Sequence, residues 1–301
     1  MLRCTRLLCL SLFFVATSAS ADPASLDGNS AFASLEPARL PSLSPTLSER
    51  ARSLWHDSQR LEDADDFVAA AEMRVRVAEL RPTDTHVRWR IARDLLHAAR
   101  RMPAADHDAR LQSFEGARRW AHEGLELDPH CGECCLYEFA ATAQLATEGG
   151  LASSVGHVRD SGALLERCLE IPPTWSEPRW GAESGQLYYG AAAFFRMLPE
   201  GAWARWVLGM RGNPERAVDL ARRATQISPD AAAFRVELGA ALLCHASRTA
   251  SPDAGAEGRR VLTEVQTRAI ETPDSVRAAG LLAEPDHACD DSAHYGRVSW
   301  R

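Results

Sequence analysis

The chain has 301 residues, 46% of them hydrophobic and 25% charged, and its 34 basic and 41 acidic residues give a formal net charge of −7. A chain of this length and composition can bury a full core as one large or two small domains. The acidic balance disfavours nucleic acid as a partner. Every basic residue is arginine, because the sequence contains no lysine.

The first 21 residues have the pattern of a cleavable export signal. Arg3 and Arg6 precede an apolar run over residues 7–16, and small residues at 19–21 match the positions that a signal peptidase reads. The run is shorter than the roughly 20 residues of a membrane span, and no later run approaches that length. Cys9 lies near its start, which disfavours a lipid anchor. We expect cleavage after Ala21 and a periplasmic or secreted protein with 32 basic (34 − 2) and 41 acidic residues, a net charge of −9.

Residues 22–46 hold four prolines among serines and alanines without a helical period, and we interpret them as a tether. Amphipathic helices are predicted from there on, whereas strand patterns are scarce. The predicted helix pairs are 47–59 with 64–80, 83–101 with 108–127, 132–147 with 155–171, 177–198 with 214–227, and 230–248 with 255–271. An ordered insert over 198–213, which contains Trp203 and Trp206, lies between the two helices of the fourth pair. A capping helix is predicted over 275–283, followed by a polar, irregular tail over 286–301.

The second helix of each pair ends with the same phrase. Residues 77–82 read VAELRP, and the counterparts are GLELDP at 124–129, CLEIPP at 168–173, ATQISP at 224–229 and the shorter AIETP at 269–273. The proline cannot continue the helix that it follows, so each phrase closes one helix before the next begins. Twelve positions before four of these prolines the residue is small, as expected where two helices cross closely. These residues are Ala70, Ala117, Ser161 and Ala217.

These endings resemble those of the tetratricopeptide (TPR) family, whose repeat ends in Ala-Leu-x-Leu-x-Pro and stacks helix pairs into a solenoid. The family's period is about 34 residues, whereas the prolines here lie 47, 44, 56 and 44 residues apart, so individual units carry inserts. The resemblance implies an all-α, TPR-like α-solenoid of about five helix pairs over residues 47–285.

A narrower resemblance covers residues 128–243. The segment GAESGQLY at 181–188 precedes a long insert, and NPERAV at 213–218 follows it. This arrangement is similar to that of the T component associated with tripartite ATP-independent periplasmic (TRAP) transporters, the TatT-like family. That resemblance implies a periplasmic solute-binding protein as partner and a solenoid that forms a homo-oligomer.

Six cysteines follow the signal, and an even count in an oxidising compartment favours disulfides. Zinc binding and a redox role are open alternatives for the segment HCGECC at 130–135, but the second Cys-x-x-Cys and the strand-helix context that they require are missing. A bridge between the last two cysteines would attach the carboxy-terminal tail to the last repeat. The cysteines are Cys131, Cys134, Cys135, Cys168, Cys244 and Cys289.

In the TPR family the first helix of each pair lines a binding groove. By this resemblance His86, Trp89, Arg93 and His97 would line it from the second unit, and Arg179, Gln186 and Tyr189 from the fourth. The alternative is that Trp89 and Tyr189 are ordinary packing residues. Members that grip a peptide carboxylate do so with lysine and asparagine, and this chain lacks lysine and has only Asn29 and Asn213.

No catalytic signature is present: the sequence has no Gly-x-Ser-x-Gly elbow, no phosphate-binding glycine loop and no zinc-protease helix. We therefore expect a protein-binding scaffold that is not an enzyme and needs no cofactor or metal. One alternative is an apolar ligand module in which the insert with Trp203 and Trp206 closes over a pocket lined by Tyr188, Phe194, Phe195 and Trp203. Another is a scaffold for envelope assembly.

Overall fold

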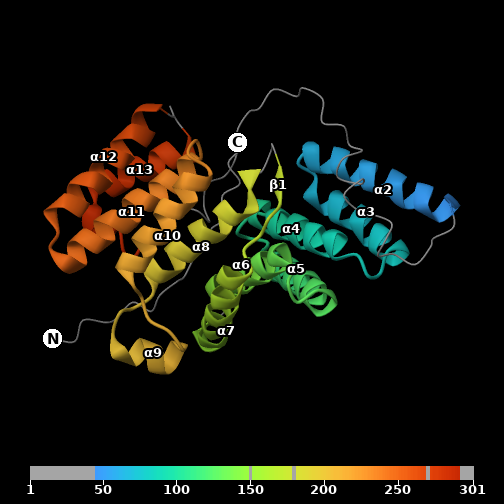
Figure 1. Cartoon of the computed structure of the whole chain (residues 1–301), viewed down its shortest axis with the longest axis horizontal. Coiled ribbons are helices and arrows are strands. Elements are labelled where there is room, and N and C mark those ends of the chain that lie inside the picture. The colour runs from blue at the N-terminus through green and yellow to red at the C-terminus, as the bar shows by residue number, and fades with distance from the viewer. Residues whose placement is uncertain (1–44, 149–150, 178–180, 269–271, 292–301) are drawn as a thin grey trace. The chain divides into compact units, whose positions relative to one another are not determined.

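The computed structural model describes residues 45–148, 151–177, 181–268 and 272–291. Within these residues the chain forms twelve α-helices, one minimal β-hairpin and a short 3-10 helix (Figure 1). The prediction of an all-α fold is confirmed. The export signal, the tether, Arg179 and the end of the tail lie outside the described residues.

The repeat domain divides into two compact units. Among the described residues, the amino-terminal unit comprises 45–142 and 167–173, and the carboxy-terminal unit comprises 143–166 and 174–291. The boundary between the units therefore runs through α6 (Gly132–Glu148) and α7 (Leu151–Glu170).

In the amino-terminal unit each helix packs on the next along the chain: α2 (Pro45–Asp63) on α3 (Phe67–Leu80), α3 on α4 (Thr85–Arg101), and α4 on α5 (His107–Leu127). Aspartates begin two of these helices. Asp66 accepts a hydrogen bond from the backbone N–H of Ala69, and Asp84 accepts one from that of His86 at 3.0 Å. Each carboxylate thus satisfies a backbone donor that the helix start leaves without a partner. Six buried side chains form the centre of this core: Ala51, Trp55, Val77, Ala78, Val87 and Ile91.

The carboxy-terminal unit pairs its helices around the insert. Helix α8 (Glu183–Met197) packs on α10 (Pro214–Ile227), while α9 (Ala202–Leu208) lies in the segment between them. The series continues with α11 (Ala232–Thr249), α12 (Pro252–Arg268) and α13 (Pro273–Ala283), each packed on the preceding helix. The predicted pairing of the fourth and fifth repeats is therefore confirmed.

The four small residues of the repeated phrase are all fully buried. Ala70, Ala117, Ser161 and Ala217 are each 0% exposed. Such positions leave no room for a larger side chain where helices approach closely. The repeat register deduced from the sequence therefore places these residues correctly.

The start of α8 differs from the sequence prediction. A helix was expected from residue 177, but α8 begins at Glu183, and residues 176–177 pair instead with 181–182 as the antiparallel strands β1 and β2. Gly181, the first residue of β2, has a φ of 71°, a left-handed conformation that glycine adopts without strain. Two-residue strands are too short to produce a period-two pattern, so the sequence did not reveal them.

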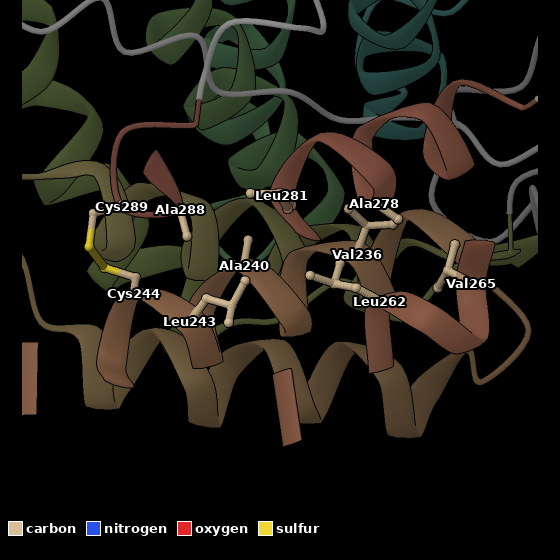
Figure 2. Close-up of a cluster of buried hydrophobic side chains, with 10 residues drawn as sticks. All are labelled: Val236, Ala240, Leu243, Cys244, Leu262, Val265, Ala278, Leu281, Ala288 and Cys289. Carbon is tan, nitrogen blue, oxygen red and sulfur yellow. A yellow bond between two sulfur atoms is a disulfide. The ribbon is translucent and has the colours of Figure 1, made fainter. Parts of the chain in front are cut away.

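The tail after Pro285 packs into the core instead of being irregular and polar from residue 286 onward. After the short 3-10 helix η2 (Pro285–His287), Ala288 is 0% and Cys289 is 5% exposed. Figure 2 shows both beside α11, with Cys289 bonded to Cys244 and Ala288 facing the apolar residues of α11–α13. The repeat unit therefore extends beyond the predicted boundary at residue 285.

Buried ion pairs join the tail to three helices. Arg196 of α8 donates hydrogen bonds to Glu237 of α11 at 2.6 and 3.1 Å, and Arg277 of α13 donates to Glu237 at 2.7 Å. Arg277 also donates to Asp291 at 2.7 Å. Arg196 further donates to the backbone carbonyls of residues 288, 289 and 291. The guanidinium of Arg196 is thus satisfied largely by a segment more than 90 residues away.

Candidate functional site

The candidate site is one face of α4, in the amino-terminal unit. The helical repeat places His86, Arg90, Arg93 and His97 along this face at spacings of three or four residues. Helix α2 brings Trp55 and Glu62 to it, and α3 brings Arg74. We call this set of residues, together with Trp89 and Asp94, the α4 cluster.

A chain of buried ion pairs runs through the α4 cluster. Glu62 accepts hydrogen bonds from Arg74 and, at 2.5 Å, from Arg93, and lies 3.8 Å from Arg90. Arg74 also donates to Asp94. The side chains of Arg74, Arg93 and Asp94 are 0% exposed. Three arginines and two carboxylates are therefore held together away from solvent.

The two carboxylates respond differently to this environment. Burial opposes the ionisation of Glu62, but Arg93, Arg74 and Arg90 together hold its pKa well below the usual range. Burial raises the pKa of Asp94 to about 6, and the charge of Glu62 adds to this effect against the attraction of Arg74. Glu62 is thus the counter-ion that its surroundings keep ionised, whereas burial disfavours the ionised form of Asp94.

Aromatic rings form the other part of the α4 cluster. The ring of His86 lies 5.3 Å from that of Trp55 and 4.9 Å from that of Trp89, in an edge-to-face arrangement with the latter. Trp89 stacks on Tyr137 with a centroid distance of 5.9 Å. The guanidinium groups of Arg90 and Arg93 lie 4.6 and 5.3 Å from the centre of the Trp89 ring. These are distances of cation–π interactions, which attract the guanidinium groups to the Trp89 ring.

The histidines at the two ends of the α4 cluster are only half-buried. Burial lowers the pKa of His86 well below 6.5, and the charges of Arg90, Arg74 and Arg93 lower it further. Burial and the charges of Arg100, Arg93 and Arg101 do the same to the pKa of His97. Both imidazoles are therefore neutral at pH 7, where each can donate one hydrogen bond and accept another.

The residues predicted to line a groove from the fourth unit occupy a different environment. Tyr189 is 1% exposed and stacks on Phe234 of α11 at a centroid distance of 5.3 Å, and Gln186 is 7% exposed. Trp89 is likewise buried, at 2%. In this structure Trp89 and Tyr189 pack between helices, which is the alternative that the sequence left open.

Five members of the α4 cluster were not singled out from the sequence: Trp55, Glu62, Arg74, Arg90 and Asp94. A signal for Arg74 was present, because it follows the buried Ala70 by four residues and precedes the buried Val77 by three. A charged residue on the apolar face of a predicted helix requires a buried counter-ion. Spacing alone could not identify which carboxylate supplies it.

The six cysteines form three disulfides: Cys131–Cys134, Cys135–Cys168 and Cys244–Cys289. The first two lie in the amino-terminal unit and the third in the carboxy-terminal unit. Disulfide-bonded sulfurs are not available as thiolate ligands, so the zinc alternative for residues 130–135 does not fit this arrangement. In the part of the chain that the structure describes, no group of three or more histidine, cysteine, aspartate and glutamate side chains is arranged to hold a metal ion.

The insert does not cover an apolar pocket. Trp203 is 55% exposed and Trp206 is 87% exposed, whereas Tyr188, Phe194 and Phe195 are buried. The insert nevertheless contains a helix, as expected for an ordered segment. Among the described residues, no helix is long and apolar enough to cross a membrane.

The comparisons with known proteins bear on the fold. No protein-family model and no curated protein matches the chain. Among solved structures, it is similar to the crystal structure of TTC0263, a thermophilic TPR protein of Thermus thermophilus, with a TM-score of 0.51 and 14% sequence identity. The alignment covers 77% of this chain and 99% of that one. The chain is therefore a TPR-like helical-repeat protein of the α-solenoid class.

Proposed function

We propose that this chain is an exported, non-catalytic scaffold that binds another protein through the face of α4. TPR-like repeats present surfaces for protein partners, and the single observation that supports this face is the α4 cluster. A helix core built for stability alone is served as well or better by apolar side chains, because desolvating ions costs more than their pairing returns. Three arginines, two carboxylates and their aromatic neighbours therefore suit recognition better than packing.

The chemistry of the α4 cluster favours a partner segment that carries carboxylates. The arginines of the cluster are buried and paired with its two carboxylates, so the groups that can meet a partner are Arg100 and His97 at one end of this face and His86 at the other. The guanidinium of Arg100 offers planar donors that match a carboxylate. The α4 cluster is positively charged within an acidic chain. Attraction between this positive charge and the carboxylates of a partner would also raise the rate of association.

Export is the second part of the proposal. It is supported by the charged, apolar and small-residue pattern of residues 1–21 and by the three disulfides, which persist in oxidising compartments. Amino-terminal sequencing of the protein from the cell envelope should give Asp22 as the first residue. A mature chain that begins at residue 1 would contradict export by this signal.

The identity of the partner rests on the resemblance to the T component of TRAP transporters. On that basis the partner is a periplasmic solute-binding protein, and the scaffold is an accessory of a solute importer. This finer assignment rests on the sequence similarity over residues 128–243.

Affinity capture from envelope extract tests the proposal. The parent protein is compared with the double variant His97→Ala/Arg100→Ala, which removes the half-buried end of the face, and with Arg119→Ala, which removes an exposed arginine of α5. We expect one captured protein whose recovery falls with the double variant and not with Arg119→Ala. Equal recovery with all three proteins would contradict binding at this face, and capture of a protein other than a solute-binding protein would contradict the TRAP assignment.

A further inference from the structure

The insert between α8 and α10 forms a closed projection. Its two ends meet where the backbone N–H of Gly212 donates to the carbonyl of Pro199 at 2.9 Å and that of Asn213 donates to the carbonyl of Phe195 at 3.0 Å. A Cβ atom on Gly212 would lie 2.0 Å from the carbonyl oxygen of Leu198, so only glycine permits this approach. Figure 1 shows α9 beyond the ends of α8 and α10, joined to them by two runs of chain.

Contacts with α7 hold the projection in place. Arg159 donates a hydrogen bond to the carbonyl of Val207 at 2.7 Å. Met210 lies against Gly162, where a Cβ atom would be 2.7 Å from its sulfur. Ala204 and Leu208, one turn apart on α9, are 0% and 9% exposed and form the inner face of the helix. The helix therefore has a fixed orientation.

The outer face of α9 exposes the two tryptophans. Trp203 and Trp206 are three residues apart and so share one face of the helix. Their exposed fractions of 55% and 87% correspond to about 350 Å² of aromatic surface in water, if a free tryptophan side chain presents about 250 Å². Leaving this surface in water is costly, and nothing in the fold of the unit requires it to be apolar.

The charge around this face is positive. Residues 201–214 contain two arginines, Arg205 and Arg211, both exposed, and no carboxylate. Glu200, at the base of the projection, is paired with Arg248 at 3.0 Å. A cationic tip on a chain with a net charge of −7 is directed toward anionic surfaces, while the rest of the molecule is repelled from them.

We propose that α9 docks on an anionic lipid bilayer, with Trp203 and Trp206 inserted at the headgroup level. Tryptophan favours this level because its ring is apolar and its N–H is polar, and arginines beside it contact lipid phosphates. A stable protein interface needs about 800 Å² on each partner, which is more than twice what the two rings expose. A bilayer surrounds a small convex tip on all sides, so an area of this size is sufficient for reversible binding.

Flotation with lipid vesicles tests the proposal. The proposed mature chain, which begins at Asp22, is mixed with vesicles of equal parts phosphatidylglycerol and phosphatidylcholine, and with vesicles of phosphatidylcholine alone. We expect binding to the anionic vesicles and at least about tenfold weaker binding after Trp206→Ser, since tenfold corresponds to only about 1.4 kcal/mol. The double variant Arg205→Gln/Arg211→Gln should bind with a smaller preference for phosphatidylglycerol. Raising the salt concentration from about 0.05 M to about 0.5 M should likewise reduce the preference of the parent protein for phosphatidylglycerol.

The control is Val276→Ser on α13, which removes another exposed apolar side chain, 66% exposed, from the same unit. It should bind vesicles like the parent. The proposal is overturned if the parent does not float with anionic vesicles, or if Trp206→Ser floats as well as Val276→Ser. It is also overturned if Trp206→Ser abolishes self-association seen by sedimentation but leaves vesicle binding unchanged.

Discussion

Glu237→Gln should strongly destabilise the carboxy-terminal unit. The carboxylate is 1% exposed and accepts hydrogen bonds from Arg196 at 2.6 and 3.1 Å and from Arg277 at 2.7 Å. The amide removes the negative charge and offers one acceptor oxygen in place of two, so two buried guanidinium groups lose their shared counter-ion. Removing one partner of a buried ion pair costs about 3 to 5 kcal/mol, a large part of a typical total of about 5 to 15 kcal/mol.

Urea unfolding followed by far-ultraviolet circular dichroism measures this loss. With a denaturant dependence of about 2 to 3 kcal/mol/M, the midpoint of the unit's transition should fall by about 1 to 2.5 M. Glu200→Gln is the matched control, because Glu200 pairs with Arg248 at 3.0 Å, but the two side chains are 40% and 53% exposed. An exposed pair contributes less than about 1 kcal/mol. If the two variants unfold at the same urea concentration, the account of the buried ion pairs is refuted.

Three further predictions concern packing and pH. Ala217→Leu should cost about 1 to 3 kcal/mol, because the alanine is 0% exposed between helices, and a melting temperature equal to the parent's would contradict the repeat register. Gly239→Ala should melt at a lower temperature than Gly280→Ala. Both substitutions gain up to about 1 kcal/mol of helix propensity. However, a Cβ atom on Gly239 would lie 2.5 Å from a leucine side chain of α12, whereas one on Gly280 would meet nothing within 4 Å. The fold lowers the pKa values of His86 and His97, so the folded state holds both imidazoles neutral. Their contribution to the free energy of unfolding is fully present above about pH 6.5 and is lost as the pH falls below that value. The loss is at most about 1.4 kcal/mol per pH unit for each histidine. The variant His86→Gln/His97→Gln should therefore lose less stability than the parent between about pH 7.5 and 5.5 in urea titrations; an equal loss would show that the imidazoles are not held neutral.

The sequence predicted the helices best where their ends carry local signals. Helix α10 has the predicted bounds, because Asn213 caps it through the N–H of Arg216 and Pro214 fits its first turn. Prediction failed where the structure depends on contacts distant in the chain. The ion pairs of Glu62 and Arg74 depend on three helices meeting, and the burial of Ala288 depends on a tail with no periodic pattern of its own.

The ties between Arg196 and the tail have a consequence for the order of folding. The carbonyls that Arg196 binds lie 92, 93 and 95 residues later in the chain. In an ideal repeat array each repeat needs only its neighbours, so folding can follow synthesis one helix pair at a time. At roughly 5 to 20 residues per second, the partners of Arg196 emerge on the order of 5 to 20 s after α8 itself. During that interval α8 cannot bury its guanidinium without leaving donors unsatisfied, so the carboxy-terminal unit closes only once residues 288–291 arrive.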